Sequence, residues 1–174
     1  MNTDLSLLEG LPPILDCRVE TLILGSFPSP ASLAARHYYA HKQNQFWRVM
    51  GEVLGEPLIE YDYAEKQRCL LRHRVGVWDV YRACRREGAL DSAIEAAEPN
   101  DFSLLKKNAP RLRRIFFNGQ AAGRFVRWFA GQGYETRILP STSPAYTLAF
   151  ARKTAVWREA WAASAISSGA SCNR

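Results

Sequence analysis

The sequence has few residues of the kinds that form disulfides and metal sites. It contains four cysteines and three histidines among 174 residues. The cysteines stand at positions 17, 69, 84 and 172, with no CxxC pair and no spacing typical of zinc or iron–sulfur ligands. We therefore expect free thiols, no metal ion and no cofactor. The GxGxxG and P-loop patterns are also missing, which argues against a domain that binds a nucleotide cofactor.

Long apolar runs are missing as well. No window approaches the roughly 20 apolar residues of a membrane helix. The first ten residues, MNTDLSLLEG, lack the basic start and apolar centre of a signal peptide. We therefore expect a cytoplasmic protein with no membrane partner. A hydrophobic share of 47% and a charged share of 23% are typical of a globular chain. The length predicts a single domain over residues 1–165, a disordered tail over 166–174, and a monomer.

Basic residues outnumber acidic residues in the sequence. Lys and Arg together number 23 against 17 Asp and Glu, which gives a net charge of +6. Most of the basic residues are Arg, whose planar guanidinium suits phosphate oxygens. This balance favours a nucleic-acid partner, although an ordinary solvated basic surface would give the same composition. The densest basic run, residues 106–114, precedes a predicted strand, so we interpret it as a solvated face away from the ligand site.

The chain alternates short apolar runs with helical patterns. Strands are predicted at 19–26, 75–81, 114–119 and 134–140, and helices from Ser29-Pro30, over 45–54 and 63–73, from Asn100-Asp101 to Asn108, over 120–130, and from Ser143-Pro144 to about 165. This alternation predicts an α/β fold of three layers, α/β/α, around a four-stranded, mainly parallel sheet. In such sheets, ligands bind at the carboxyl ends of the strands.

Two loops at that edge have similar sequences, ILGSFPSPAS (23–32) and ILPSTSPAYT (138–147). Each places Ser and Pro where we expect a strand to lead into a helix N-terminus, which can bind a phosphate group. The structural alternative is strong, because Ser-Pro is a common helix cap and most caps bind no ligand.

Residues 36–47 combine four aromatic rings with two His, an Arg, a Lys and an Asn. Rings near a basic loop can stack on a base, and amides can read its edge. Phe46 and Trp47 fit the apolar stripe of the next helix, so we assign them to the core. Tyr39 and Asn44 precede that stripe and are candidates for binding.

Two further polar residues belong to predicted apolar strands: Asn118 lies at the end of one, and Asp79 lies within another. Asn118-Gly119 ends a predicted strand; the pair is a common turn signal, but it also places an amide at the ligand edge. Asp79 lies within an apolar run, where an unpaired charge would be costly. It is the most suggestive carboxylate of the sequence for a functional role, and a structural pairing with an Arg is the alternative.

Five segments, taken in order, resemble the uracil-DNA glycosylase superfamily. They are GSFPS (25–29), YYAHKQNQFW (38–47), VWDVYRACRREGALDSAI (77–94), FFNGQAA (116–122) and LPSTSPAYT (139–147). The resemblance covers most of residues 11–160 and is nearest to the hypoxanthine-DNA (deoxyinosine) glycosylases, with mismatch-specific uracil and thymine glycosylases more distant. It implies an enzyme of base-excision repair that flips a deaminated base out of DNA and hydrolyses its N-glycosidic bond without a metal ion, leaving an abasic site.

The resemblance also implies roles for single residues. Asn44 matches the position that holds the attacking water in the hypoxanthine family. Tyr39 or Phe27 would stack on the flipped base, and Asn118 would recognise it together with backbone N–H groups around Gly25 and Ser26. Four residues of the last segment would contact DNA: Ser141, Thr142, Ser143 and Tyr146.

Two positions depart from the patterns of relatives and keep alternatives open. Phe27 stands where many relatives have a polar residue that positions water, so a non-catalytic DNA-binding relative remains an alternative. Leu139 stands where some relatives have a His, which argues against fast removal of uracil. A uracil or broad deaminated-base glycosylase, acting also on xanthine, is the other alternative.

Overall fold

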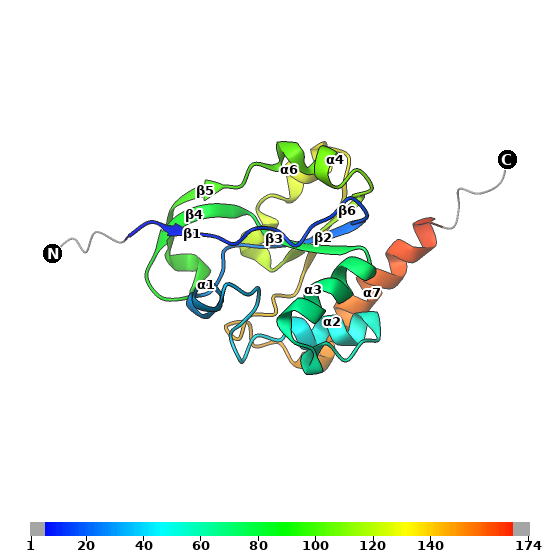
Figure 1. The fold of residues 1–174 in the computed structure, drawn as a ribbon, viewed down its shortest axis with the longest axis horizontal. Helices are drawn as coiled ribbons and strands as arrows, with labels where there is room; N and C mark the ends of the chain where they lie inside the picture. Colours follow the sequence, from blue (N-terminus) through cyan, green and yellow to red (C-terminus); the bar gives the residue numbers. More distant parts are fainter. Residues whose placement is uncertain (1–5, 169–174) are drawn as a thin grey trace.

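The computed structural model describes residues 6–168, and the side chains of residues 6–163. Its centre is a parallel sheet of four strands in the order β3-β2-β6-β7 (Figure 1). The strands are β2 (Thr21–Gly25), β3 (Val75–Asp79), β6 (Arg114–Asn118) and β7 (Glu135–Leu139). All four lie within the predicted ranges. β2 and β6 fit best, because apolar runs ended by Gly or Asn are typical of buried parallel strands.

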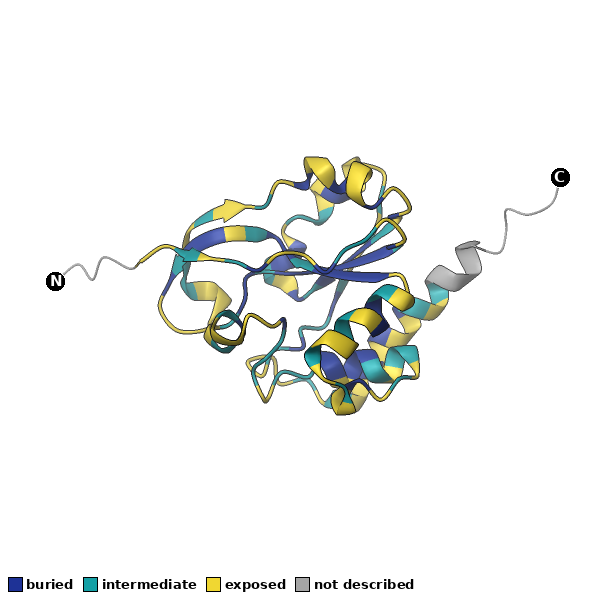
Figure 2. Ribbon diagram, viewed as in Figure 1, coloured by how far each residue is buried: buried dark blue, intermediate teal, exposed yellow. Residues whose placement is uncertain are grey.

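Helices cover both faces of this sheet and complete the predicted three layers. One face carries α2 (Phe46–Leu54), α3 (Tyr63–Arg72) and α7 (Phe150–Ser168), and the other carries α4 (Leu105–Asn108), α5 (Gln120–Gly123) and α6 (Val126–Gly131) (Figure 1). Alternate residues of β2 enter the two cores: Ile23 packs in the core with α2 and α7, whereas Leu22 and Leu24 pack in the other. Figure 2 shows the buried residues concentrated in the sheet and on the helix faces that meet it.

The first three predicted helices are confirmed, and so is the predicted N-cap of the first. α1 (Pro30–Ala35) has Ser29 as its N-cap, and the Ser29 hydroxyl accepts a hydrogen bond from the backbone N–H of Ser32. α3 begins with a capping box in which Asp62 and Glu65 each accept from the other's backbone N–H. The short 3₁₀ helix η1 (Leu58–Glu60) connects α2 to α3.

The predicted strand 75–81 is wrong in its last two residues. The chain leaves the parallel sheet after Asp79, where the N–H groups of Val80 and Tyr81 bond to the carbonyls of Gly25 and Ser26. It then forms the hairpin β4 (Tyr81–Arg86) and β5 (Ile94–Pro99), with the 3₁₀ helix η2 (Asp91–Ala93) near its tip. With β1 (Leu8–Glu9), the hairpin makes a second, antiparallel sheet that the sequence analysis missed. Apolar residues continue through the break, so the pattern did not mark it.

The last predicted helix starts too early. Residues 140–149 form a loop, and α7 begins at Phe150 rather than at Ser143-Pro144. The hydroxyls of Ser141 and Ser143 each accept from the backbone N–H two residues further on, which stabilises turns instead of a helix. Only the first of the two Ser-Pro loops therefore leads directly into a helix.

Three smaller differences complete the description. The predicted helix 120–130 is divided into α5 and α6, and the predicted helix to Asn108 consists of the 3₁₀ helix η3 (Phe102–Leu104) followed by α4. Residues 166–168 of the expected tail continue α7, and residues 169–174 lie outside the described residues. Within residues 6–168, no helix is both long and apolar enough to cross a membrane.

Candidate active site

A cavity of about 570 Å³ opens at the carboxyl ends of the parallel strands. The last residue of every strand lines it: Gly25 of β2, Asp79 of β3, Asn118 of β6 and Leu139 of β7. Loops after β2 and β7, the segment between α1 and α2, and the tip of the β4–β5 hairpin form its walls. The cavity therefore lies where parallel sheets bind their ligands.

The Asn118 side chain is held in one orientation within this cavity. Its amide nitrogen donates to the hydroxyl of Thr142 at 2.9 Å, and its oxygen accepts from the backbone N–H of Thr142 at 2.9 Å. The sequence analysis expected Thr142 to contact DNA. Its side chain is instead fully buried and serves to orient Asn118. One amide hydrogen and one oxygen lone pair of Asn118 remain for a ligand.

Asn44 lines the same cavity from the segment that precedes α2. Its side-chain oxygen accepts a hydrogen bond of 2.9 Å from the backbone N–H of Phe46, the first residue of α2. Because a carboxamide oxygen has two lone pairs, a second donor such as water can still bind it. The residue therefore fixes the start of the helix and faces the ligand site.

Tyr39 lines the cavity with one ring face already covered. Its ring stacks on Phe46 with 3.9 Å between the centroids, so at most the other face is open to a base. Its hydroxyl is buried and makes no hydrogen bond within the described residues, although the Asn118 amide lies nearby. Burial and then the Asp79 carboxylate raise the pKa of Tyr39 well above its ordinary range, which keeps the hydroxyl protonated and able to donate.

Asp79 does not form the ion pair with an Arg that was one expectation from the sequence, as judged over the described residues. Its side-chain atom Oδ2 is buried and has no hydrogen-bond partner among the described residues. Arg86, whose charge acts on Asp79, donates to the carbonyl of Pro28 instead. Burial and the Asp91 carboxylate raise the pKa of Asp79 to about 7, and the Arg86 guanidinium opposes this shift. The sequence analysis singled out this carboxylate, because it stands in an apolar strand, but did not assign it to the site.

The loop after β2 is fixed to the β4–β5 hairpin. The Ser26 hydroxyl donates to a carboxylate oxygen of Asp91. The Arg86 guanidinium lies 5.3 Å from the centre of the Phe27 ring, which is almost fully buried. Ser26 and Phe27 both line the cavity, as expected, and so do hairpin residues that the sequence did not indicate: Ala89, Leu90, Asp91 and Ser92.

The loop after β7 brings the remaining predicted residues to the mouth of the cavity. Ser141, Ser143 and Tyr146 line it, and the Tyr146 side chain is 47% exposed. Lys153 of α7 donates a hydrogen bond to the carbonyl of Tyr146 at 3.3 Å and is itself buried. The exposed Tyr146 therefore stands on a loop that a buried side chain anchors.

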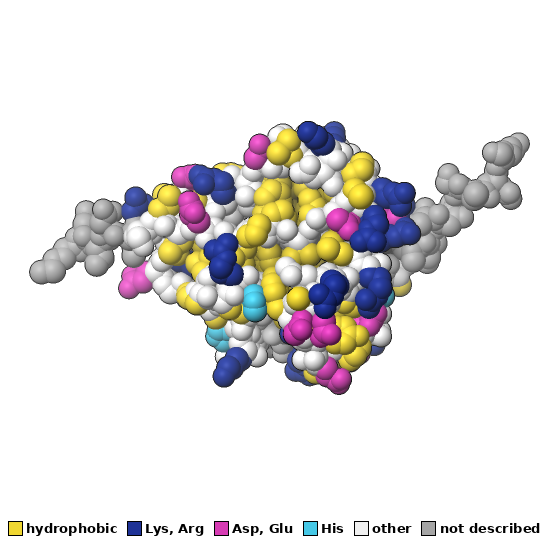
Figure 3. All heavy atoms as spheres, viewed as in Figure 1, with side chains coloured by type: hydrophobic (Ala, Val, Ile, Leu, Met, Phe, Trp, Pro, Cys, Tyr) yellow, Lys and Arg dark blue, Asp and Glu magenta, His cyan; other side chains and the backbone are white. Residues whose placement is uncertain are grey.

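The basic run 106–114 lies away from the cavity, as predicted. Arg113 and Arg114 are at the amino end of β6, where Arg113 pairs with Glu20 at 2.6 Å and Arg114 donates to the Thr21 hydroxyl at 2.9 Å. On the face seen in Figure 3, basic side chains are dispersed with acidic ones among them. Two basic side chains of the run are thus already occupied by contacts at the amino edge of the sheet.

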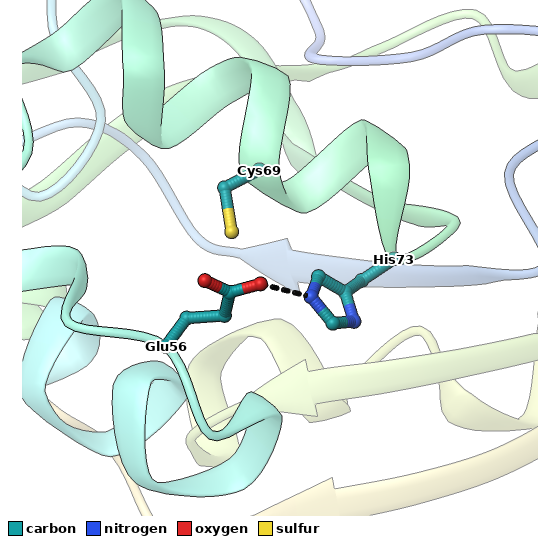
Figure 4. Close-up of side chains that lie close together, drawn as sticks. All are labelled: Glu56, Cys69 and His73. Carbon is teal, nitrogen blue, oxygen red and sulfur yellow. Dashed lines mark hydrogen bonds and ion pairs between the residues drawn. The ribbon is translucent and has the colours of Figure 1, made fainter.

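Three potential metal ligands meet at the end of α3: Glu56, Cys69 and His73, whose ligand atoms lie within 4.8 Å of one another (Figure 4). Glu56 already bonds His73 at 2.7 Å and Arg72 at 3.0 Å, and Arg72 also donates to the Cys69 sulfur at 3.5 Å. These contacts and the Tyr61 hydroxyl lower the pKa of Glu56 to about 2. Because a guanidinium already neutralises this carboxylate, we interpret the cluster as an ion-pair network.

Comparisons with known proteins agree with this geometry. A family model described as the Uracil DNA glycosylase superfamily matches residues 12–164. A Methanosarcina barkeri protein named Hypoxanthine DNA glycosylase is 40% identical over 153 residues, covering 88% of this chain and 97% of the relative. A Methanosarcina acetivorans protein of the same name is 47% identical over 137 residues, covering 79% and 87%. The solution NMR structure of a candidate uracil DNA glycosylase from Methanosarcina acetivorans matches with a TM-score of 0.82 and 42% identity, over 90% of this chain and 97% of the other.

Proposed function

Since the chain belongs to the uracil-DNA glycosylase superfamily, we propose that it is a DNA glycosylase that removes hypoxanthine from deoxyinosine. Two relatives named for that activity, at 40% and 47% identity, support this substrate. The observation that carries the proposal is that two carboxamides, Asn44 and an oriented Asn118, line one cavity at the strand ends. The enzyme would act on cytoplasmic DNA as a monomer and without a metal ion.

The Asn118 orientation suits hypoxanthine better than adenine. Hypoxanthine presents a carbonyl acceptor (O6), to which the amide hydrogen that Thr142 leaves free can donate. Adenine presents an amino donor at that position instead. An unrestrained carboxamide could turn over to match adenine, but the two bonds with Thr142 prevent this. A fixed amide therefore discriminates by leaving polar groups unpaired in the wrong complex.

Asn44 would position the water that replaces the base. Cleavage of the C1′–N9 bond leaves positive charge on the sugar, as in other glycoside hydrolyses with oxocarbenium-like transition states. An amide is a weak base, but attack on such a cation depends on placement more than on basicity. The second lone pair of the Asn44 oxygen would accept from this water while the Phe46 N–H holds the first.

The remaining residues would hold the flipped nucleotide and the opened duplex. Backbone N–H groups near Gly25, Ser26 and Phe27 would bond the base, and the open face of Tyr39 would stack on it, a contact worth about 1–3 kcal/mol. The loop with Ser141, Ser143 and Tyr146 would contact the DNA, with the exposed Tyr146 ring nearest the gap that the flipped base leaves.

A panel of duplexes tests the proposal. Each would carry one hypoxanthine, uracil, xanthine or mismatched thymine, and alkali would cleave the abasic sites that form. We expect fastest release of hypoxanthine in single-turnover reactions. Faster release of uracil would instead identify a uracil glycosylase, and binding without release of any base would identify a non-catalytic relative.

A further inference from the structure

The base of the cavity contains a carboxyl group that the proposed steps do not use. Asp79 is only 5% exposed, yet it lines the cavity and its Oδ2 has no hydrogen-bond partner among the described residues. Its Oδ1 lies against the backbone of Gly25, where a Cβ atom would come within 2.5 Å of it. A buried polar group without a partner is costly, so it is retained where a ligand supplies the partner.

Groups from three neighbouring parts of the fold surround Asp79. Tyr38 and Tyr39 lie between α1 and α2, Tyr63 begins α3, and Asp91 and Arg86 belong to the β4–β5 hairpin. Burial raises the pKa of each of these tyrosines, so all three are neutral at physiological pH. The charges that act on Asp79 are therefore those of Asp91 and Arg86, of opposite sign.

We propose that Asp79 is a further catalytic residue that protonates the departing purine. This inference rests on the proposed function and adds a proton donor to it. As the C1′–N9 bond breaks, its electron pair moves to the purine, and the Asp79 carboxyl proton passes to the purine nitrogen N7. The water at Asn44 then bonds to C1′ and releases its spare proton to solvent, from which the Asp79 carboxylate regains a proton. Water and nucleotide are consumed, and an abasic site and neutral hypoxanthine are formed.

The placement of the site agrees with this role. On hypoxanthine, N7 is adjacent to O6, the oxygen that Asn118 would bind. Asp79 and Asn118 end strands that flank β2 on its two sides, and the intervening residue, Gly25, has no side chain to separate them. Burial favours the protonated carboxyl and raises its pKa to about 7, which suits a donor at physiological pH.

The test measures single-turnover release of hypoxanthine from duplex DNA between pH 5.5 and 9. It compares the wild-type enzyme with Asp79→Asn, Asp91→Asn and a control, Asp16→Asn, which makes the same chemical change in an exposed ion pair with Arg18. We expect the wild-type rate to fall as the pH rises through about 7, because the active form is protonated. Asp79→Asn should be slower by about 10²-fold or more and should lose this pH dependence.

Asp91→Asn separates proton donation from a structural role. Removing the Asp91 charge should move the fall in rate to lower pH, because that charge helps to keep Asp79 protonated. The control Asp16→Asn should follow the wild-type profile. If Asp79→Asn does not fold, judged by thermal melting, the Asp91→Asn profile decides alone.

Three outcomes would overturn the inference. They are a wild-type rate in Asp79→Asn, a slow Asp79→Asn enzyme that keeps the wild-type pH profile, and an unshifted profile in Asp91→Asn. A wild-type enzyme that releases no hypoxanthine at any pH would instead refute the proposed function, and the inference with it.

Discussion

Asn118 and Thr142 exchange two hydrogen bonds of 2.9 Å, one through the backbone and one through the side chain of Thr142. The first residue ends β6 and the second lies in the loop after β7, so the pair links two strand ends of the cavity. The backbone carbonyl of Thr142 also accepts a hydrogen bond from the backbone N–H of Gln45, the residue after Asn44. A single buried threonine is thus hydrogen-bonded to both of the segments that carry a candidate carboxamide.

This link predicts the effect of Thr142→Val. The substitution removes the hydroxyl that accepts a hydrogen bond from the Asn118 amide, so one amide hydrogen is left unpaired. Hypoxanthine release should therefore slow by about 10-fold to 100-fold, which corresponds to about 1–3 kcal/mol. Thr142→Ser keeps the hydroxyl and is the matched control. Single-turnover assays of both variants measure the effect; equal rates for Val and Ser would show that the hydroxyl does not position Asn118.

Asn44 should contribute both to catalysis and to stability. In Asn44→Ala the water loses its acceptor, so the rate should fall by about 10²–10³-fold, the magnitude of one preorganised polar group. The variant also loses the bond to the Phe46 N–H, which should lower the free energy of unfolding by about 1 kcal/mol. Asn44→Asp keeps an acceptor for that N–H and should melt near the wild-type temperature. Thermal melting and DNA binding, together with the rate, distinguish the two roles.

Gly25 should not tolerate a side chain. An added Cβ would lie 2.5 Å from Asp79 Oδ1 and 3.2 Å from the Tyr39 hydroxyl. Gly25→Ala should therefore displace one of these groups, lower stability by about 1–3 kcal/mol and slow base release. Gly131→Ala in α6 is the control, since its added Cβ would meet no atom within 4 Å beyond its chain neighbours and the backbone of its own helix. Denaturant unfolding and release assays compare the two; equal behaviour would contradict the close approach.

The Glu56 cluster should stabilise the fold in a pH-dependent way. Hydrogen bonds from His73 and Arg72 lower the pKa of Glu56 from its ordinary 4.5 to about 2. A lowered carboxyl pKa contributes stability that is present above about pH 4.5 and is lost as the pH falls toward 2. Glu56→Gln should therefore melt at a lower temperature than wild type at pH 6, with the difference shrinking toward pH 3. A constant difference across this range would contradict the shift.

DNA binding should weaken with salt, because phosphate contacts release counterions. The slope of log affinity against log salt should be about one unit for each phosphate contact. Tyr146→Ala, which alters an exposed ring without changing charge, should weaken binding while leaving this slope unchanged. Fluorescence anisotropy between 50 and 300 mM salt, roughly the range over which such effects are large, measures both. An affinity independent of salt would argue against a DNA-binding surface.

The candidate site was predictable from the sequence only in part. Gly25, Ser26, Phe27, Tyr39, Asn44 and Asn118 all line the cavity, because each follows or ends a recognisable element or belongs to the segment between two such elements. Thr142 could not be distinguished from its neighbours Ser141 and Ser143, since a short polar loop gives no periodic signal of which side chain is buried.

The sequence by itself determined the four parallel strands and most helix starts, because apolar periodicity and capping residues act over a few neighbouring positions. Only the tertiary structure decided that the β4–β5 hairpin reaches the cavity, that Thr142 orients Asn118, and that Asp79 is buried without a partner. Those relationships join residues far apart in the chain. They depend on how strands and loops pack against one another, which no local pattern of residues records.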